Sequence, residues 1–265
     1  MNTAENYVAI NKALWNERTK HHLQSEFYDV NAFLKGASSL NSIELDMLGD
    51  VAGKSILHLQ CHFGQDTLSL ARMGAKVMGV DLSDAAIDTA KDLALKMAID
   101  ATFICCNIYD LPTLLEAQFD IVFTSYGTIG WLPDLKPWAA IVHRYLKPGG
   151  HFVFAEFHPV IWMFDNDLTY VQYSYFNREA IVETEQGTYA DKSADIELKS
   201  VGWNHAIDEV LQNLLDTGLQ LQQFEEFDYS PYDVFPGMKA TEPGRFQLEK
   251  MPGKIPLVYA LKMVR

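Results

Sequence analysis

Short apolar runs alternate with amphipathic helical patterns along the middle of the chain. This alternation is typical of parallel βαβ units. We expect strands at residues 55–59, 76–80, 102–106, 119–125 and 151–157, and helices at 65–73, 84–98 and 135–146. Gly74 marks a helix end, Ser83 an N-cap, and 147–150 a turn before the fifth strand. The pattern therefore predicts an α/β fold.

The remainder of the chain has a different texture. Eight aromatic residues lie within residues 160–205. The alternation over Tyr170–Phe176 and the turn-like Gln186-Gly187 predict a β-hairpin or small antiparallel addition. A helix is expected at 205–217, and strands at 219–228 and 257–264. A connection that holds half of the ten prolines separates these strands, and such long connections are typical of functional loops.

Composition and charge narrow the classes of partner. The chain has 265 residues, 21 Lys+Arg against 35 Asp+Glu, and a net charge of −14. Without a dense basic run, neither nucleic acid nor an anionic membrane is an expected partner. We find no signal peptide pattern and no run of about 18 apolar residues, and the three cysteines do not form a disulfide framework. These features favour a cytoplasmic protein of one elaborated domain.

Polar positions follow the expected strands where their carboxyl ends meet, which is where open parallel sheets bind ligands. The turn Leu59–Gly64 enters a helix, whose N-terminus can hold a polar or anionic group. Asp81 ends the next strand and can accept hydrogen bonds from a ribose diol. Asn107 and Ile108 offer an amide and an apolar surface to an adenine, and Ser125-Tyr126-Gly127 follows the fourth strand.

With these motifs the sequence resembles the class I S-adenosylmethionine-dependent methyltransferases. The resemblance runs from about Ser55 to Phe157 and rests on His58–Gly64, Asp81, Asn107-Ile108 and, most specifically, Leu146-Lys147-Pro148-Gly149-Gly150. It implies a Rossmann-like, mostly parallel seven-stranded sheet with helices on both faces and an antiparallel last strand. It also implies S-adenosyl-L-methionine as methyl donor, with contacts at Tyr28, Gln60, Cys61, His62, Gly64, Asp81, Leu82, Asn107, Ile108 and Ser125.

The turn departs from the family's Gly-x-Gly-x-Gly pattern. Only Gly64 remains, Gln60 and His62 replace the other glycines, and His58 stands where an acid is common. Because glycine permits positive φ and a close approach to a ligand, the departure predicts a different loop geometry or less space. The Leu-Gln-Cys-His-x-Gly form is typical of a branch of bacterial methyltransferase-like proteins.

Candidates for proton transfer are His158 and Tyr126, with a structural role as the alternative for each. His205, Glu156, Arg18 and His22 are further candidates for contacts. His58, Cys61 and His62 have a spacing that could ligate a metal. No further Cys/His pair completes a tetrahedral site, so we expect no metal.

The resemblance divides the chain into four segments. Residues 1–50 form an N-terminal helical cover, 51–159 a donor-binding core, 160–204 an aromatic-rich insertion, and 205–265 a C-terminal helix and strand pair. The expected function is methyl transfer to a small molecule. The alternatives are a non-catalytic binder of S-adenosylmethionine or S-adenosylhomocysteine and, less favoured without a G-x-G-x-x-G motif, an NAD-dependent oxidoreductase.

Overall fold

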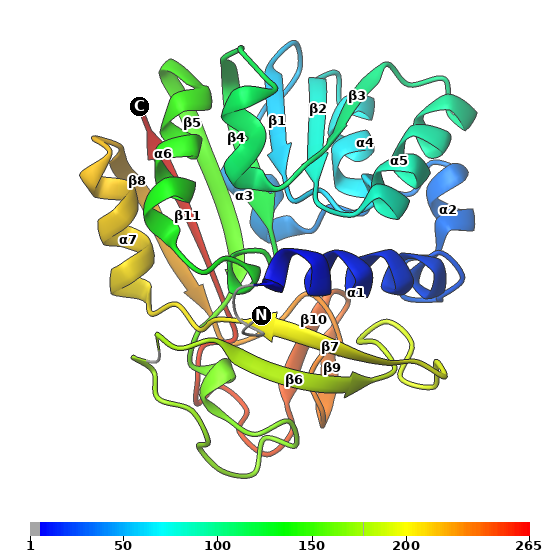
Figure 1. The fold of residues 1–265 in the computed structure, drawn as a ribbon, viewed down its shortest axis with the longest axis vertical. Helices are drawn as coiled ribbons and strands as arrows, with labels where there is room; N and C mark the ends of the chain where they lie inside the picture. The colour runs from blue at the N-terminus through cyan, green and yellow to red at the C-terminus, as the bar shows by residue number, and fades with distance from the viewer. Residues whose placement is uncertain (1–5, 177) are drawn as a thin grey trace.

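A twisted seven-stranded sheet forms the centre of the molecule (Figure 1). The computed structural model describes residues 6–176 and 178–265. The strand order is β3-β2-β1-β4-β5-β11-β8, in which β1 to β5 run parallel and β11 is antiparallel to both β5 and β8. The strands are β1 (Ser55–Leu59), β2 (Lys76–Asp81), β3 (Ala101–Cys105), β4 (Phe119–Ser125), β5 (Leu146–Phe157), β8 (Gln220–Phe227) and β11 (Val258–Val264). The predicted sheet is confirmed.

Helices cover both faces of this sheet. One face packs against α6 (Leu135–Tyr145), α7 (Ile207–Asp216) and the 3-10 helix η2 (Ile108–Thr113). The other packs against α3 (Ser42–Leu48), α4 (Gln65–Arg72) and α5 (Asp84–Lys96). Each helix turns an apolar stripe to the sheet, and burial of the two stripes is the main stabilising contribution.

The boundaries of the expected helices follow their capping signals. The Ser83 hydroxyl accepts a hydrogen bond from the Ala86 N–H at 3.0 Å, which caps α5. Gly74 follows the C-cap of α4 with φ +91°. One boundary was wrong: β5 begins at Leu146, because Leu146 already pairs with Phe119, and the Lys147–Gly150 segment continues as strand across a register shift.

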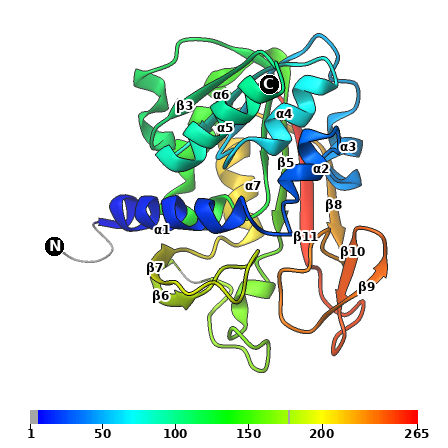
Figure 2. The ribbon, with the colours of Figure 1, turned by 90° about the vertical axis from the view of Figure 1, so that its right-hand side faces the viewer.

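The N-terminal helices divide between two layers. Helix α1 (Tyr7–His22) lies across the carboxyl ends of the parallel strands, and α2 (Val30–Leu34) follows at its end (Figures 1 and 2). Helix α3, in contrast, packs on the sheet face, where Ile43, Met47 and Leu48 join the apolar cluster. Helix α1 thus lies over the strand ends, whereas α3 is part of the core.

The expected hairpin exists, and its first strand ends at the predicted Gln186-Gly187 turn. Its strands are β6 (Ile181–Gln186) and β7 (Glu197–Gly202), and the predicted strand at Tyr170–Phe176 is wrong. Tyr170 is 60% exposed and Phe176 70% exposed, so their alternation has no buried face to form against. The hairpin is held to α1 by Asn11, whose side chain donates to Val201 O at 2.8 Å and accepts from Val201 N at 3.0 Å.

The proline-rich connection contains a second small hairpin that the sequence did not predict. It consists of β9 (Met238–Glu242) and β10 (Arg245–Leu248). Leu248 packs with Ile161, Phe235 and Leu257, so the connection has an apolar cluster of its own. The remaining short elements are the 3-10 helices η3 (Ile129–Trp131) and η4 (Ile161–Met163). Over the described residues, the helices are too short or too polar to cross a membrane.

Replacing Phe154 with alanine tests the sheet core. Phe154 is fully buried on β5. The centroid of its ring lies 5.6 Å from that of Trp138 and 5.6 Å from that of Tyr259. We expect Phe154→Ala to lower the free energy of unfolding by about 3–5 kcal/mol. The control is Leu95→Ala, since Leu95 is 81% exposed on α5. Urea unfolding of both variants gives the comparison, and equal effects would contradict the assigned packing.

Candidate functional site

A cavity of about 960 Å³ opens at the carboxyl ends of β1, β2 and β4. The strand ends form its floor, α1 forms part of one wall, and residues from the 160–204 insertion and the proline-rich connection complete the enclosure. Tyr28, Gln60, Cys61, His62, Gly64, Asp81, Leu82, Asn107, Ile108, Ser125 and Tyr126 all line it. The structure thus brings together every donor contact expected from the sequence.

The Gln60–Gly64 turn keeps a left-handed backbone although two of its glycines are replaced. Gln60 has φ +55°, His62 φ +50° and Gly64 φ +80°. Left-handed conformations are costly for residues with a Cβ, so other contacts must hold them. Gln60 Nε2 donates to Thr128 O at 2.7 Å, and Cys61 N donates to Val80 O at 2.9 Å. The loop therefore retains the backbone conformation that glycines favour, contrary to the expected change in geometry.

Gly64 also makes close packing possible. A methyl group at this position would lie 2.9 Å from Phe103 Cε1 and 3.0 Å from Ala90 Cβ. Both contacts are closer than normal van der Waals separations, and Ala90 belongs to α5 while Phe103 belongs to β3. Only glycine lets α4 begin this near to the neighbouring helix and strand.

Asp81 joins this turn to the end of β2. Its Oδ2 accepts a hydrogen bond from His62 N at 2.8 Å, and its Oδ1 accepts one from Ser83 N at 2.8 Å. Burial raises the pKa of Asp81, while the two N–H donors oppose that shift. The backbone of Leu82 also donates to Asp81, and a carboxylate has about four lone-pair sites, so the group can still accept a hydrogen bond from a hydroxyl in the cavity.

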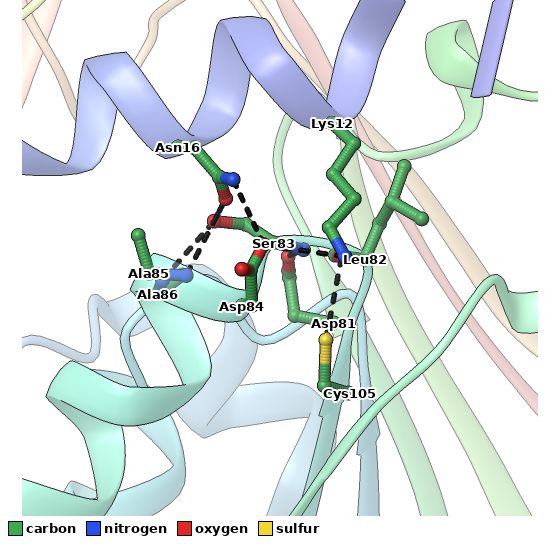
Figure 3. Close-up of polar contacts among 9 residues, drawn as sticks. All are labelled: Lys12, Asn16, Asp81, Leu82, Ser83, Asp84, Ala85, Ala86 and Cys105. Atoms are coloured by element: carbon green, nitrogen blue, oxygen red, sulfur yellow. Dashed lines mark hydrogen bonds and ion pairs between the residues drawn. The ribbon is translucent and has the colours of Figure 1, made fainter. Parts of the chain in front are cut away.

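Helix α1 is anchored over the turn between β2 and α5 (Figure 3). Asn16 Oδ1 accepts from the Ser83 hydroxyl at 2.7 Å, and Asn16 Nδ2 donates to Asp84 Oδ1 at 2.8 Å. Lys12 adds an ion pair to Asp84 with an N–O distance of 3.2 Å. Because Asp84 lies in the first turn of α5, these contacts tie the wall of the cavity to its floor.

Asn107 and Ile108 lie at the end of β3, beside Leu82. The Asn107 side chain accepts from Tyr109 N at 3.2 Å and so also forms the turn that the alternative interpretation expected. It makes a further hydrogen bond to Tyr7, a residue of α1. Ile108 is buried and presents an apolar surface to the cavity.

Comparison with known families agrees with this arrangement. Residues 56–150 match a family model described as a methyltransferase domain, and they include the 60–64 turn, Asp81 and Asn107. The sheet has the seven mostly parallel strands and the antiparallel last strand expected from the resemblance. Residues 56–150 are thus similar to a methyltransferase domain.

Relatives of this methyltransferase domain align with about half of the chain. A methyltransferase of Synechocystis sp. described as uncharacterized is 36% identical over 131 residues, covering 49% of this chain and 59% of that protein. A ubiquinone biosynthesis O-methyltransferase of Alkalilimnicola ehrlichii is 31% identical over 135 residues, covering 49% of this chain and 54% of that protein. The chain therefore spans little more than half the length of these relatives.

Solved structures share the fold over a longer stretch. An S-adenosylmethionine-dependent methyltransferase from Mesorhizobium loti aligns with a TM-score of 0.57 at 20% identity, covering 88% of this chain and 100% of that chain. At this identity the likeness concerns the fold of the methyltransferase domain.

Tyr28 connects the N-terminal segment to the cavity floor of the methyltransferase domain. Its backbone oxygen accepts from Gln65 Nε2 at 3.0 Å, and its ring lies against His22 and Phe63, with centroids 5.1 and 4.7 Å away. The Tyr28 hydroxyl forms a hydrogen bond with the hydroxyl of Tyr189, a residue of the insertion. Tyr28 thus contacts both the floor and the insertion.

Several buried polar atoms around Tyr28 have no partner among the described residues. These are Arg18 Nε, both ring nitrogens of His22, Gln60 Oε1 and His62 Nε2. Burial lowers the pKa of His22 to about 3 and that of His62 well below its usual value, so both imidazoles are neutral. Unpartnered buried polar atoms are rare in folded proteins, and their grouping here fits a polar ligand.

The second proton-transfer candidate, His158, does not reach the cavity. Its Nε2 lies 2.8 Å from Glu226 Oε1, and its Nδ1 accepts from Val160 N at 3.2 Å. Both ring nitrogens therefore have partners away from the cavity lining. The structure does not bring together His158 and Tyr126, and only Tyr126 is placed to meet a ligand.

Glu156, His205 and His58, which were also candidates, have partners within the protein. Glu156 accepts hydrogen bonds from the backbone N–H groups of Gly127, Thr128, Ile129 and Phe157. His205 Nε2 lies 2.8 Å from Leu132 O, and His58 Nδ1 lies 2.8 Å from Thr67 Oγ1. Within the described residues, no three His, Cys, Asp or Glu side chains are grouped as metal ligands.

Sequence reasoning missed two acids at the site, the buried Glu44 and the half-buried Asp66. Asp66 lines the cavity from the first turn of α4 and accepts from the Ser125 hydroxyl at 3.2 Å. Glu44 lies behind Tyr126, whose hydroxyl donates to Glu44 Oε2 at 2.7 Å. Asn41 and Glu44 form a capping box that was readable from their spacing, but that signal points to helix structure only.

Alanine at Gly64 tests the close packing of the turn. We expect Gly64→Ala to lower the free energy of unfolding by about 2–4 kcal/mol, because left-handed strain and overpacking add. Gly149→Ala is the matched control, since Gly149 has φ +76° and open space around its Cα. Chemical denaturation should show a smaller loss for the control, and equal losses would argue against the clash.

Proposed function

We propose that the protein transfers a methyl group from S-adenosyl-L-methionine to a small-molecule acceptor that is neutral or cationic. The observation that carries this proposal is the pairing of Asp81 with the left-handed Gln60–Gly64 turn on the cavity floor. This geometry lies within the segment that matches the methyltransferase family model. We further propose that the protein acts in the cytoplasm on a small molecule, and not on nucleic acid or a membrane.

The residues present fit the donor. Asp81 offers carboxylate oxygens to a ribose diol, and Leu82, Asn107 and Ile108 line the neighbouring space where an adenine fits. The unpartnered atoms of Gln60, His62 and Arg18 can meet the polar amino-acid portion. A buried polar atom without a hydrogen bond costs free energy. A ligand that forms hydrogen bonds with these atoms therefore binds more tightly.

When bound, S-adenosylmethionine supplies an electrophilic methyl group on a sulfonium. The task of the protein is then to orient the acceptor and exclude water. Trp15, Trp131 and Tyr189 enclose the floor with aromatic rings, and Trp15 and Trp131 lie edge-on with centroids 5.4 Å apart. These rings form a largely apolar enclosure above the strand ends.

The acceptor half of the cavity is aromatic, and the cavity as a whole is acidic. Phe157, Trp162 and Phe235 contact one another there, with centroids 5.3 to 6.0 Å apart. Among the described lining residues, seven are Asp or Glu, while the only Lys or Arg are Arg18 and Lys192. Arg18 is already paired with Glu185. This balance supports a neutral or cationic acceptor with an aromatic or apolar body, because a carboxylate would meet like charges.

The non-catalytic alternative was motivated by the two replaced glycines. Gln60 and His62 adopt left-handed φ values that glycine would also adopt, so this motivation loses its force. Methyl transfer remains the better supported function of the site.

Asparagine at position 81 tests donor binding. We expect wild type to bind S-adenosylmethionine in isothermal titration calorimetry, and Asp81→Asn to bind about 10- to 100-fold more weakly, because charge-assisted hydrogen bonds to the ribose are lost. Asp120→Asn is the matched control: Asp120 also accepts a backbone N–H, from Ser55 at 2.8 Å, but lies at the opposite end of the sheet. Absence of donor binding by wild type would refute the proposal.

The charge preference of the acceptor half can be tested with two phenols of similar shape and opposite charge. We expect tyramine to bind about tenfold more tightly than 3-(4-hydroxyphenyl)propionate, because the lining is acidic. Quenching of tryptophan fluorescence reports binding, since Trp15, Trp131, Trp162 and Trp203 line the cavity. Tighter binding of the carboxylate would contradict the assigned acceptor charge.

A further inference from the structure

A tyrosine–carboxyl pair links the cavity wall to the interior of the protein. Tyr126 directly follows β4 with φ +46°, and its N–H donates to Ala155 O at 2.7 Å. This left-handed turn is unfavourable for a bulky residue, and it directs the phenol along the wall. The Tyr126 hydroxyl donates to Glu44 Oε2 at 2.7 Å. Tyr126 lines the cavity, whereas Glu44 is 0% exposed behind it.

Helix capping accounts for only one oxygen of Glu44. Oε1 accepts from Asn41 N at 2.6 Å and from Asn41 Nδ2 at 3.1 Å, which completes the capping box of α3. A glutamine at this position would complete the same box. The acidity of Glu44 and the contact of Oε2 with Tyr126 are therefore not explained by the helix end.

The surroundings of Glu44 favour a proton on its carboxyl group. The titratable groups that face it are Asp66, Tyr126 and Tyr232, and none of these is a cation. Burial and the charge of Asp66 raise the pKa of Glu44 to about 7. A group whose pKa lies near neutral pH can both accept and release a proton under ordinary conditions.

Tyr126 lies at the boundary between the two halves of the cavity. Its ring centroid is 5.7 Å from that of Phe157, which belongs to the acceptor half, and 5.3 Å from that of Tyr232. Ser125, the preceding residue, is one of the expected donor contacts. A nucleophile that approaches the donor from the acceptor half therefore passes the Tyr126 side chain.

We propose that Tyr126 and Glu44 form the proton route of the acceptor, in which Tyr126 takes a proton from the nucleophile and passes its own proton to Glu44. The inference rests on the proposed methyl transfer and deepens it. Tyr126 is the catalytic residue of the pair, and Glu44 is the positioning residue that receives the proton through it. The acceptor class that needs such a route is a phenol, an alcohol or an ammonium group.

The proposed step balances. A lone pair of the oxygen or nitrogen nucleophile forms the bond to the methyl carbon, and the electron pair of the carbon–sulfur bond remains on sulfur as a thioether. The nucleophile's proton moves to Tyr126 Oη as the phenolic proton moves to Glu44 Oε2. Because both protons move together, Tyr126 never holds a full negative charge, which agrees with the strong rise in its pKa beside Glu44.

A stability measurement tests the acidity of Glu44 without any acceptor. The pKa of Glu44 in the folded protein, about 7, is raised above the ordinary value of a glutamate side chain. This group's stabilising contribution is therefore present at low pH and is lost as pH rises toward and through 7. We expect Glu44→Gln to gain stability relative to wild type from about pH 5 to about pH 7 in urea unfolding, and the difference to level off above pH 7. A difference that stays constant over this range would overturn the proposal.

Kinetics tests the route itself with a panel of phenols, alcohols and primary amines, tyramine included. With any acceptor that reacts, we expect Glu44→Gln and Tyr126→Phe each to lower kcat about 10²-fold, and Glu44→Gln to remove the rise in kcat with pH near 7. Donor affinity by calorimetry should stay unchanged in Glu44→Gln. Tyr145→Phe is the control, because Tyr145 is buried on α6 and donates to Leu115 O, away from the cavity.

The possible failures are distinguishable. If wild type binds no donor, the proposed function fails, whereas the stability measurement still decides the acidity of Glu44. If wild type binds the donor but methylates no member of the panel, the proposed acceptor class is overturned. An unchanged kcat and pH profile in Glu44→Gln would overturn the proposed route and leave Glu44 with its helix-capping role alone.

Discussion

The hydrogen bonds of the Asp81 carboxylate connect all parts of the site. One oxygen holds the N–H of His62 in a left-handed turn, and the other holds the N–H of Ser83 at the start of α5. Ser83 in turn bonds Asn16 of α1. The turn after β1, the turn after β2 and the cavity wall thus depend on the Asp81 carboxylate. Removing this group from water costs free energy, and the hydrogen bonds from the surrounding N–H donors offset that cost.

The parallel core was predictable because its strands are buried on both faces and its helices are bounded by strong local signals. The run at Phe119–Ser125 became β4 with the expected boundaries, and Ser83 caps α5 as expected. The site floor followed from the core, since the carboxyl ends of parallel strands meet at one edge. Its left-handed turn did not follow, because the contacts that hold Gln60 come from residue 128, far along the chain.

The segments outside the core were less predictable for a physical reason. Tyr170–Phe176 shows strand-like alternation, yet most of it has no partner surface, whereas β6 and β7 form where α1 can hold them. The hairpin of β9 and β10 also lacked a visible signal, because its pairing covers only a few residues of a polar segment. Glu44 was visible as a helix cap, but its partner Tyr126 is 82 positions away in the sequence.

Asn11 has a consequence for how the cavity can exchange its contents. Its side-chain amide bonds both the N–H and the oxygen of Val201, much as a neighbouring strand would, and α1 thereby acts as an edge for β7. Two further contacts join α1 to this hairpin. Arg18 forms an ion pair with Glu185 of β6, and the ring of Tyr7 contacts that of Trp203, directly after β7. Helix and hairpin therefore form one connected layer across the carboxyl ends of the parallel strands (Figure 2). Any displacement that widens the cavity beneath α1 must carry the hairpin with it or break the amide pair.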